Sequence, residues 1–246
     1  MHPLLASFRR RRQNKQRIPT PFGYLHKWFN LTPKGVLQVG AHAGGEIKAF
    51  VTQGVKNGIF IEPLPDIYKR LEKAVATHRG YFAVNAVCTD SAGKTCSFHV
   101  SSGGSTGASS SLLKPTGVKS VHPEVPFDSQ PITLISTTID QVVADFIAKG
   151  HANVVENLDM LYMDTQGSEL IVLKGASQFL NQVRYIYAEV SLGGLYEGDV
   201  THIELSSYLA SRGFSLAFLY MNKHGWGDAL YIHNSLFNIN LADSAA

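Results

Sequence analysis

The sequence of 246 residues has few cysteines, no long apolar run and no acidic residue near its start. Two cysteines, Cys88 and Cys96, are too few for a disulfide framework or a zinc site made by cysteine alone, so we expect buried free thiols. No apolar run approaches the roughly 18 residues that span a bilayer. The apolar stretch at the start precedes the basic residues, whereas a secretory signal has its positive charge first. We therefore expect a cytoplasmic protein.

No aspartate or glutamate precedes Glu46, which leaves the basic residues at the N-terminus without nearby opposite charge. Arg9–Arg12, Lys15 and Arg17 hold six of the 22 basic residues, although the net charge is only +3. Such an arm can contact nucleic acid, anionic lipid or an acidic partner. Nucleic acid is disfavoured, because interleaved aromatics and a basic folded face are not evident. We expect residues 1–34 to form a solvated basic arm and a short aromatic cap segment.

From Gly35 onward, short apolar segments alternate with amphipathic ones. The pattern predicts strands at 36–39, 58–61, 81–87, 132–135, 158–163, 185–190, 214–220 and 229–232. It predicts helices at 46–53, 66–78, 139–149, 169–175 and 201–212. Such alternation is typical of βαβ units, with a parallel sheet covered by helices on both faces. The sequence therefore predicts one α/β domain at residues 35–246.

One segment, residues 101–130, interrupts this pattern and is rich in Ser, Gly, Pro and Lys. That composition is typical of a linker. A long irregular stretch inside a compact domain is also typical of a binding loop or lid. Both interpretations stay open at this stage.

The turn after the first predicted strand, Gly40-Ala-His-Ala-Gly44, suits close approach of backbone to a ligand. Its G-x-x-x-G spacing differs from the dinucleotide G-x-G-x-x-G, which disfavours a nicotinamide dehydrogenase. Glu46 places negative charge near the following helix N-terminus and disfavours a phosphate there. Glu62 ends the second predicted strand about 20 residues further on, where a carboxylate can accept hydrogen bonds from ribose hydroxyls. Tight packing of the turn and an exposed strand-end glutamate are the alternatives.

Several motifs follow one another in a specific order: Val36-Leu-Gln-Val-Gly-Ala-His-Ala-Gly44, Ile61-Glu-Pro63, Asn85-Ala86, Ser109-Ser-Ser-Leu112, Asp164-Thr-Gln-Gly-Ser-Glu169, Val172-Leu-Lys-Gly-Ala176 and Glu189-Val-Ser191. The ordered set resembles the FkbM family of S-adenosylmethionine-dependent methyltransferases. The resemblance implies a class I, Rossmann-like methyltransferase fold: a three-layer sandwich around a mostly parallel seven-stranded sheet with an antiparallel C-terminal strand. It also implies methyl transfer from S-adenosyl-L-methionine to an oxygen, often a hydroxyl of a sugar or natural product. The family's usual aspartate in the first motif is Gln38 here.

The resemblance implies a role for each matched cofactor residue. Gly40, His42 and Gly44 would surround the methionine portion of the cofactor, and Glu62 would bind the ribose. Asn85, expected just inside the end of the third strand, would contact the adenine edge, with packing against its own strand as the alternative.

Two carboxylates are the predicted catalytic residues. Asp164 follows the strand at 158–163 and so lies at the edge where open α/β sheets bind ligands; capping the next helix is a second role for it. Glu189 ends a neighbouring strand, and a raised pKa would suit it as the proton acceptor. Hard divalent metals prefer more than two oxygen ligands, so we expect a metal-free site. Tyr196 and Trp226 lie in segments that can line the acceptor side; for Trp226 the favoured interpretation is packing within a loop, and stacking on a sugar ring is the alternative.

The sequence thus predicts an O-methyltransferase with a small-molecule or glycan acceptor. A catalytically silent relative, recruited through the basic arm, is the alternative. Retention of Gly40, Gly44, Glu62 and Asp164 disfavours it, because a silent protein need not keep a cofactor site.

Overall fold

The computed structural model describes Leu25, residues 31–102 and residues 107–237. Nearly all of these fall in one compact unit, Pro33–Ala246. The predictions for the arginine arm and for the aromatic cap segment, apart from Leu25 and residues 31–34, lie outside the described residues.

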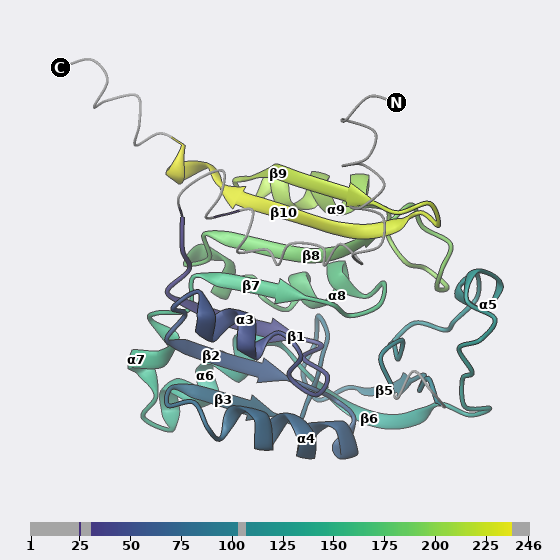
Figure 1. Cartoon of the computed structure of the whole chain (residues 1–246), viewed down its shortest axis with the longest axis horizontal. Helices are drawn as coiled ribbons and strands as arrows, with labels where there is room; N and C mark the ends of the chain where they lie inside the picture. Colours follow the sequence, from purple (N-terminus) through teal and green to yellow (C-terminus); the bar gives the residue numbers. More distant parts are fainter. Residues whose placement is uncertain (1–24, 26–30, 103–106, 238–246) are drawn as a thin grey trace, which may run out of the picture. The chain divides into compact units, whose positions relative to one another are not determined.

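A seven-stranded sheet with the order β3-β2-β1-β7-β8-β10-β9 organises the unit (Figure 1). Its strands are β1 (Gly35–Val39), β2 (Asn57–Ile61), β3 (Tyr81–Val84), β7 (Met160–Met163), β8 (Tyr185–Ser191), β9 (Phe214–Met221) and β10 (Trp226–His233). All neighbouring pairs from β3 to β8 are parallel, and β10 is antiparallel to both β8 and β9. This topology confirms the predicted class I methyltransferase sheet with its antiparallel C-terminal strand.

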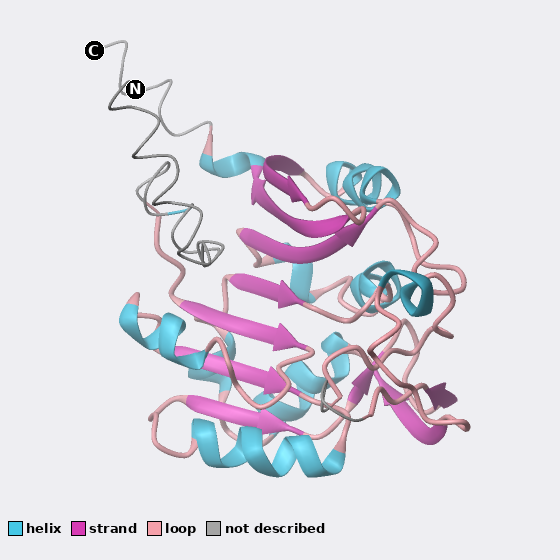
Figure 2. Ribbon diagram, turned by 45° about the vertical axis from the view of Figure 1, so that its right-hand side comes forward, coloured by secondary structure: helices cyan, strands magenta, loops and turns pink. Residues whose placement is uncertain are grey.

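Helices cover both faces of this sheet (Figures 1 and 2). On one face lie α3 (Ile47–Thr52) and α4 (Pro65–Val75); on the other lie α6 (Ile139–Ala148), α8 (Glu169–Lys174) and α9 (His202–Ser211). Because β1, β7 and β8 are central, their apolar side chains enter the core; Leu37, Leu161 and Ile186 are fully buried there. Helix α9 begins with a capping box between Thr201 and Glu204.

The predicted strand at 81–87 is wrong in its second half. β3 ends at Val84, and the chain then pairs as β4 (Val87–Cys88) in a separate sheet of order β4-β6-β5. Asn85, predicted inside the strand, lies exposed between the two, and its amide donates to the carbonyls of Glu62 and Pro63 at 2.8 and 3.0 Å. These bonds turn the chain away from the large sheet.

The small sheet contains two further strands, β5 (Thr95–Phe98) and β6 (Ile132–Thr137), which pair antiparallel. The alternation pattern did not predict β5, and it gave no hint that 132–137 would leave the main sheet. Two short helices, α5 (Val118–Val121) and α7 (Ala152–Val155), were also missed. Each has only four residues, too short for a helical period to stand out.

The two cysteines differ in their burial. Cys88 is buried, which raises the pKa of its thiol to about 12 and makes it unreactive. Cys96 is only half-buried. Both are free thiols, as predicted, but the predicted burial holds only for Cys88. None of the helices in the described ranges has the length and apolar character needed to cross a membrane.

Candidate active site

The turn after β1 depends on glycine for two reasons. Gly40 has φ +79°, and a Cβ there would collide with the backbone carbonyl oxygen of Asp164 at the end of β7. The amides of Gly40 and Ala41 both donate to the Ile61 carbonyl, at 3.0 and 2.9 Å. The absent side chain therefore lets the ends of β1, β2 and β7 meet closely.

Replacing Gly40 by alanine is expected to lower the free energy of unfolding by about 3 kcal/mol or more, because the left-handed φ and the clash with Asp164 add. Gly54→Ala is the matched control: Gly54 has φ +81° with open space where a Cβ would stand. That variant should lose only about 1 kcal/mol. Urea unfolding of the cofactor-free protein measures both. Equal losses of unfolding free energy in the two variants would show that the close approach of Gly40 to Asp164 does not contribute to the cost.

Glu62 follows β2 and is 5% exposed. Its Oε2 accepts the backbone N–H of His42 at 2.9 Å, and its Oε1 accepts that of Leu64 at 2.9 Å. Burial raises the pKa of this carboxyl, while the two backbone donors and nearby His42 oppose the rise. A carboxylate has about four acceptor positions, so two bonds to the backbone leave acceptor capacity for a ligand.

A cavity of about 220 Å³ opens beside this carboxylate. One part of its wall is apolar and includes Val87, Cys88, Phe98 and Leu112. Another part carries the carboxylates of Glu46, Glu62 and Asp164 together with His42. Among the described residues that line it there is no lysine or arginine. Such a wall suits a planar apolar ring at one end and hydroxyl or cationic groups at the other, and it does not suit a pyrophosphate.

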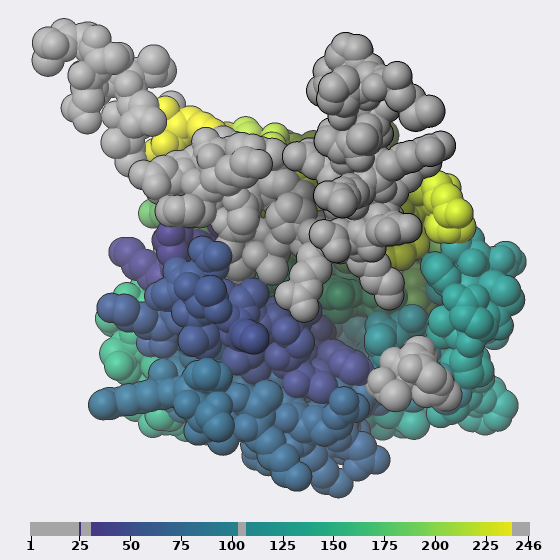
Figure 3. All heavy atoms as spheres, in the orientation of Figure 1, coloured from purple at the N-terminus to yellow at the C-terminus, as the bar shows by residue number. Residues whose placement is uncertain are grey.

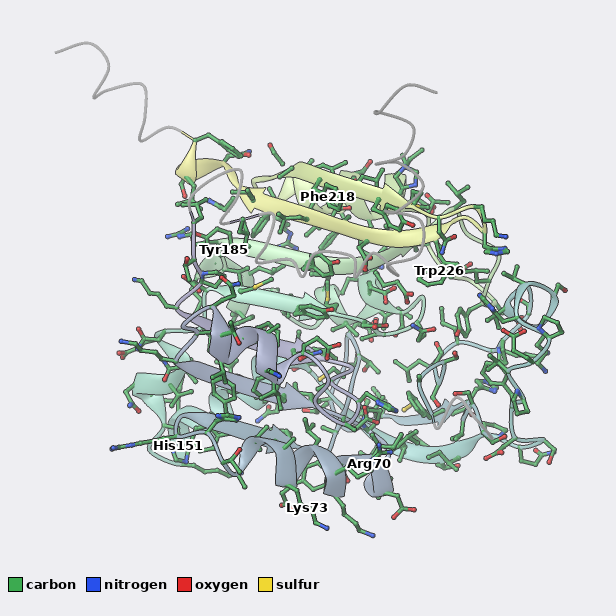
Figure 4. All side chains as sticks on the ribbon, viewed as in Figure 1. Arg70, Lys73, His151, Tyr185, Phe218 and Trp226 are labelled. Atoms are coloured by element: carbon green, nitrogen blue, oxygen red, sulfur yellow. The ribbon has the colours of Figure 1, made fainter. Side chains whose placement is uncertain are left out.

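A second cavity, of about 350 Å³, adjoins the first and shares Ala108, Asp164 and Gln166 with it. Glu189 and Tyr196 line it, as does Trp226. Trp226 is the first residue of β10, and Figure 4 shows it on the side of the sheet toward α5. Tyr185, the first residue of β8, lies at the opposite end of the strands. In Figure 3 the surface recedes between the purple β1–α3 segment and the teal segment around α5. Trp226 begins β10, so its placement in a loop was wrong.

The two predicted catalytic carboxylates stand at the same edge of the sheet. Asp164 follows β7, and Glu189 is the fifth residue of β8, the neighbouring strand. Both accept from the amide of Gln166, whose Nε2 lies 2.8 Å from Asp164 Oδ1 and 2.6 Å from Glu189 Oε2. The alternative role of Asp164 as a helix cap is wrong, because Ser168 occupies the N-cap position of α8.

Glu189 lies in an acidic environment. Burial and the charges of Asp164, Glu169 and Asp228 raise its pKa well above the ordinary value for glutamate. Burial likewise raises the pKa of Glu169 to about 7 and that of Asp228 to about 6. The rise in the pKa of Glu189 agrees with the raised pKa expected of it as a base.

The serine-rich segment forms part of the cavity walls, which favours a binding loop over a linker. Ser111 is fully buried and donates from its Oγ to the carbonyl of Gln166 at 2.7 Å. The backbone N–H of Ser101 donates to Ser110 Oγ at 3.0 Å. The hydroxyl of Tyr196 lies 3.0 Å from the carbonyl of Ser109. These bonds connect sequence positions that no local pattern relates.

Two predicted cofactor residues do not line the first cavity. A Cβ at Gly44 would meet Ile47, Leu71 and Ala74, so this glycine serves the packing of the turn against α4. Asn85 supports the turn beside Glu62 through its amide, as described above. Their predicted contacts with a cofactor stay predictions. Gln166 was not predicted as a site residue, although it belongs to the motif Asp164-Thr-Gln-Gly-Ser-Glu169.

No three His, Cys, Asp or Glu side chains in the described part of the chain are placed to hold a metal ion together. The metal-free mechanism stays a prediction.

A sheet of this order, with a glycine turn after β1 and a carboxylate after β2 beside a cavity at the carboxyl ends of the strands, defines the class I methyltransferase fold. The methyltransferase FkbM domain model matches residues 38–216. The chain therefore belongs to the FkbM methyltransferase family, as the sequence motifs predicted.

Individual relatives are distant. The 2-O-methyltransferase NoeI of Sinorhizobium fredii (strain NBRC 101917 / NGR234) is 27% identical over 170 residues, which are 67% of this chain and 66% of that protein. The chain thus matches slightly less than two thirds of that relative's length. Among solved structures, magnesium protoporphyrin IX methyltransferase from Synechocystis PCC 6803 is similar with a TM-score of 0.47 and 10% identity, covering 85% of this chain and 74% of that one. A SAM-dependent methyltransferase from Aquifex aeolicus has a TM-score of 0.45 and 13% identity, covering 87% and 89%.

Proposed function

We propose that the protein is an S-adenosyl-L-methionine-dependent O-methyltransferase that acts on a hydroxyl of a sugar, glycan or natural-product acceptor. The observation that carries the proposal is the pair of adjoining cavities: Glu62 lines the first, Glu189 lines the second, and Asp164 lines both. Family membership supports methyl transfer, and the distant 2-O-methyltransferase supports transfer to oxygen.

The first cavity fits the chemistry of this cofactor. Its apolar wall around Val87 and Phe98 suits adenine, and the remaining acceptor capacity of Glu62 suits the ribose hydroxyls. Glu46 and Asp164 supply negative charge for an ammonium and a sulfonium group. The missing lysine and arginine among the described lining residues disfavour a dinucleotide.

S-adenosylmethionine supplies an electrophilic methyl group when it is bound. The protein's contribution is first to hold an acceptor hydroxyl in line with that group, since alignment can lower a barrier by about 7–11 kcal/mol. Glu189 would then accept the hydroxyl proton on its carboxylate, which would leave the acceptor oxygen free to take the methyl group. Tyr196 and the segment at 107–112 limit the access of water to the same place.

The direct test is to incubate the protein with labelled cofactor and fractionated cell extract and to identify the fraction that takes up label. Titration calorimetry with S-adenosylhomocysteine provides a second measurement, of cofactor binding, that needs no acceptor. Label in a hydroxyl-bearing product supports the proposal; absence of cofactor binding would overturn it. Binding without transfer to any fraction, including glycan and natural-product extracts, would favour the silent relative instead.

Binding of S-adenosylhomocysteine is also expected to slow amide hydrogen exchange at residues 107–112 by about tenfold or more, because bound ligand stabilises the segment that lines its cavity. Amides of α9 lie outside both cavities and serve as the internal control. Mass spectrometry of peptides with and without ligand gives the measurement. Unchanged exchange at 107–112 would separate this segment from the cofactor.

A further inference from the structure

Gln166 occupies an unusual position between β7 and α8. Its φ is +55°, a left-handed conformation that residues other than glycine seldom adopt. It lines both cavities, a property that it shares only with Ala108 and Asp164 among the described lining residues. Backbone in this conformation persists where the surrounding structure holds it, and it is concentrated at functional sites.

The side chain of Gln166 connects three functional groups. Its amide nitrogen lies within hydrogen-bond distance of Asp164 and Glu189, as described above, and its Oε1 lies 3.0 Å from the Tyr196 hydroxyl. Charged carboxylates only accept hydrogen bonds, whereas a phenol can donate one. The two carboxylates therefore fix the amide orientation, because the reverse would place an oxygen against both of them. The single O–H of Tyr196 faces two acceptors, Gln166 Oε1 and the carbonyl of Ser109.

The backbone of Gln166 is held as well. Its carbonyl accepts from Ser111 Oγ at 2.7 Å, and Ser111 has no exposed surface. The hydroxyl of Ser111 also accepts the N–H of Leu113 at 3.0 Å. Both ends of the residue are thus fixed by segments far away in the sequence.

Three acidic side chains surround Glu189. Asp164 acts from the end of β7, Glu169 from α8 and Asp228 from β10, and all three disfavour its negative charge. The Tyr196 phenol lies in the same environment. Neither cavity has a lysine or arginine among its described lining residues. The amide of Gln166 is thus a neutral donor between two carboxyl groups that also interact with each other.

We propose that Gln166 is a positioning residue, whose amide holds Asp164 and Glu189 at a fixed separation and stabilises their ionised forms at the junction of the two cavities. The inference rests on the proposed function for its catalytic meaning, because it concerns the group that would accept the acceptor's proton. The hydrogen bonds themselves can be tested without an acceptor.

The test is carboxyl-carbon NMR titration of the full chain with ¹³C-labelled glutamate, with the Glu189 signal assigned from its loss in Glu189→Gln. Gln166→Leu keeps most of the volume and removes the donor. Its titration midpoint for Glu189 should rise by about one pH unit, because a hydrogen bond to the charged form has been lost. Gln141→Leu is the matched control, since Gln141 donates to Asp145 at 2.8 Å on the exposed face of α6; it should leave the midpoint of Glu189 unchanged.

A purely structural role would lower the melting temperature of Gln166→Leu and leave the Glu189 midpoint where it is, which would overturn the proposal. If the leucine variant does not fold, Gln166→Asn replaces it, because asparagine tolerates the left-handed conformation and is one methylene too short to reach both carboxylates. Calorimetry with S-adenosylhomocysteine on the wild-type protein separates the two ideas. A midpoint shift without cofactor binding would refute the proposed function and keep the inference about Gln166.

Discussion

Glu62→Ala is expected to weaken binding of S-adenosylhomocysteine by about 100-fold or more. Two charge-assisted hydrogen bonds to the ribose would be lost, each worth about 1.5–3 kcal/mol. The substitution also frees the buried backbone N–H groups of His42 and Leu64, which now bond to the carboxylate. Part of the loss in affinity should therefore come from disorder of the turn that follows β1. Titration calorimetry at constant pH measures it.

Two variants make this experiment specific. Glu62→Gln keeps the shape and retains one oxygen acceptor, so its loss should fall between that of alanine and the wild type. Glu72→Ala removes an exposed carboxylate from α4, where it accepts from the Tyr68 hydroxyl at 3.1 Å, and should leave affinity unchanged. An affinity of Glu62→Ala within threefold of wild type would remove this residue from the cofactor site.

Glu189→Gln is expected to lower turnover by about 10²–10⁴-fold, the usual contribution of a general base. Affinity for S-adenosylhomocysteine should stay nearly unchanged, because Glu189 lines the second cavity and not the first. Glu197→Gln is the matched control: its carboxylate is exposed beside Lys114, one residue from Tyr196, and its loss should not alter the rate. Labelled cofactor and the identified acceptor provide the assay.

The pH dependence of the wild-type rate follows from the raised pKa of Glu189. A base is active when ionised, so the rate should fall as pH decreases through this raised pKa and level off above it. A cationic methyl donor beside Asp164 favours the ionised form of Glu189, which shifts the acidic fall in rate toward lower pH in the complex. The rate of Glu189→Gln should not show this fall. Activity abolished by EDTA and restored by magnesium would contradict the metal-free assignment.

The sequence by itself determined the class of fold and the edge at which the site lies. Strands such as β1 and β8 are central and buried on both faces, so their apolar runs are visible without any partner. Carboxyl ends of parallel strands meet at one edge, which is why Glu62, Asp164 and Glu189 could be grouped in advance. The glycine turn was readable for the same local reason, and the ordered motifs identified the family.

Only the tertiary structure decided which residues complete the site. Asn85 leaves the sheet because its amide bonds to carbonyls 22 and 23 positions earlier, and Gly44 serves packing against α4. Gln166 gained its role from Glu189, 23 positions later, and from Ser111, 55 positions earlier. Hydrogen bonds over such separations leave no periodic trace in the sequence, because the folded backbone brings their partners together.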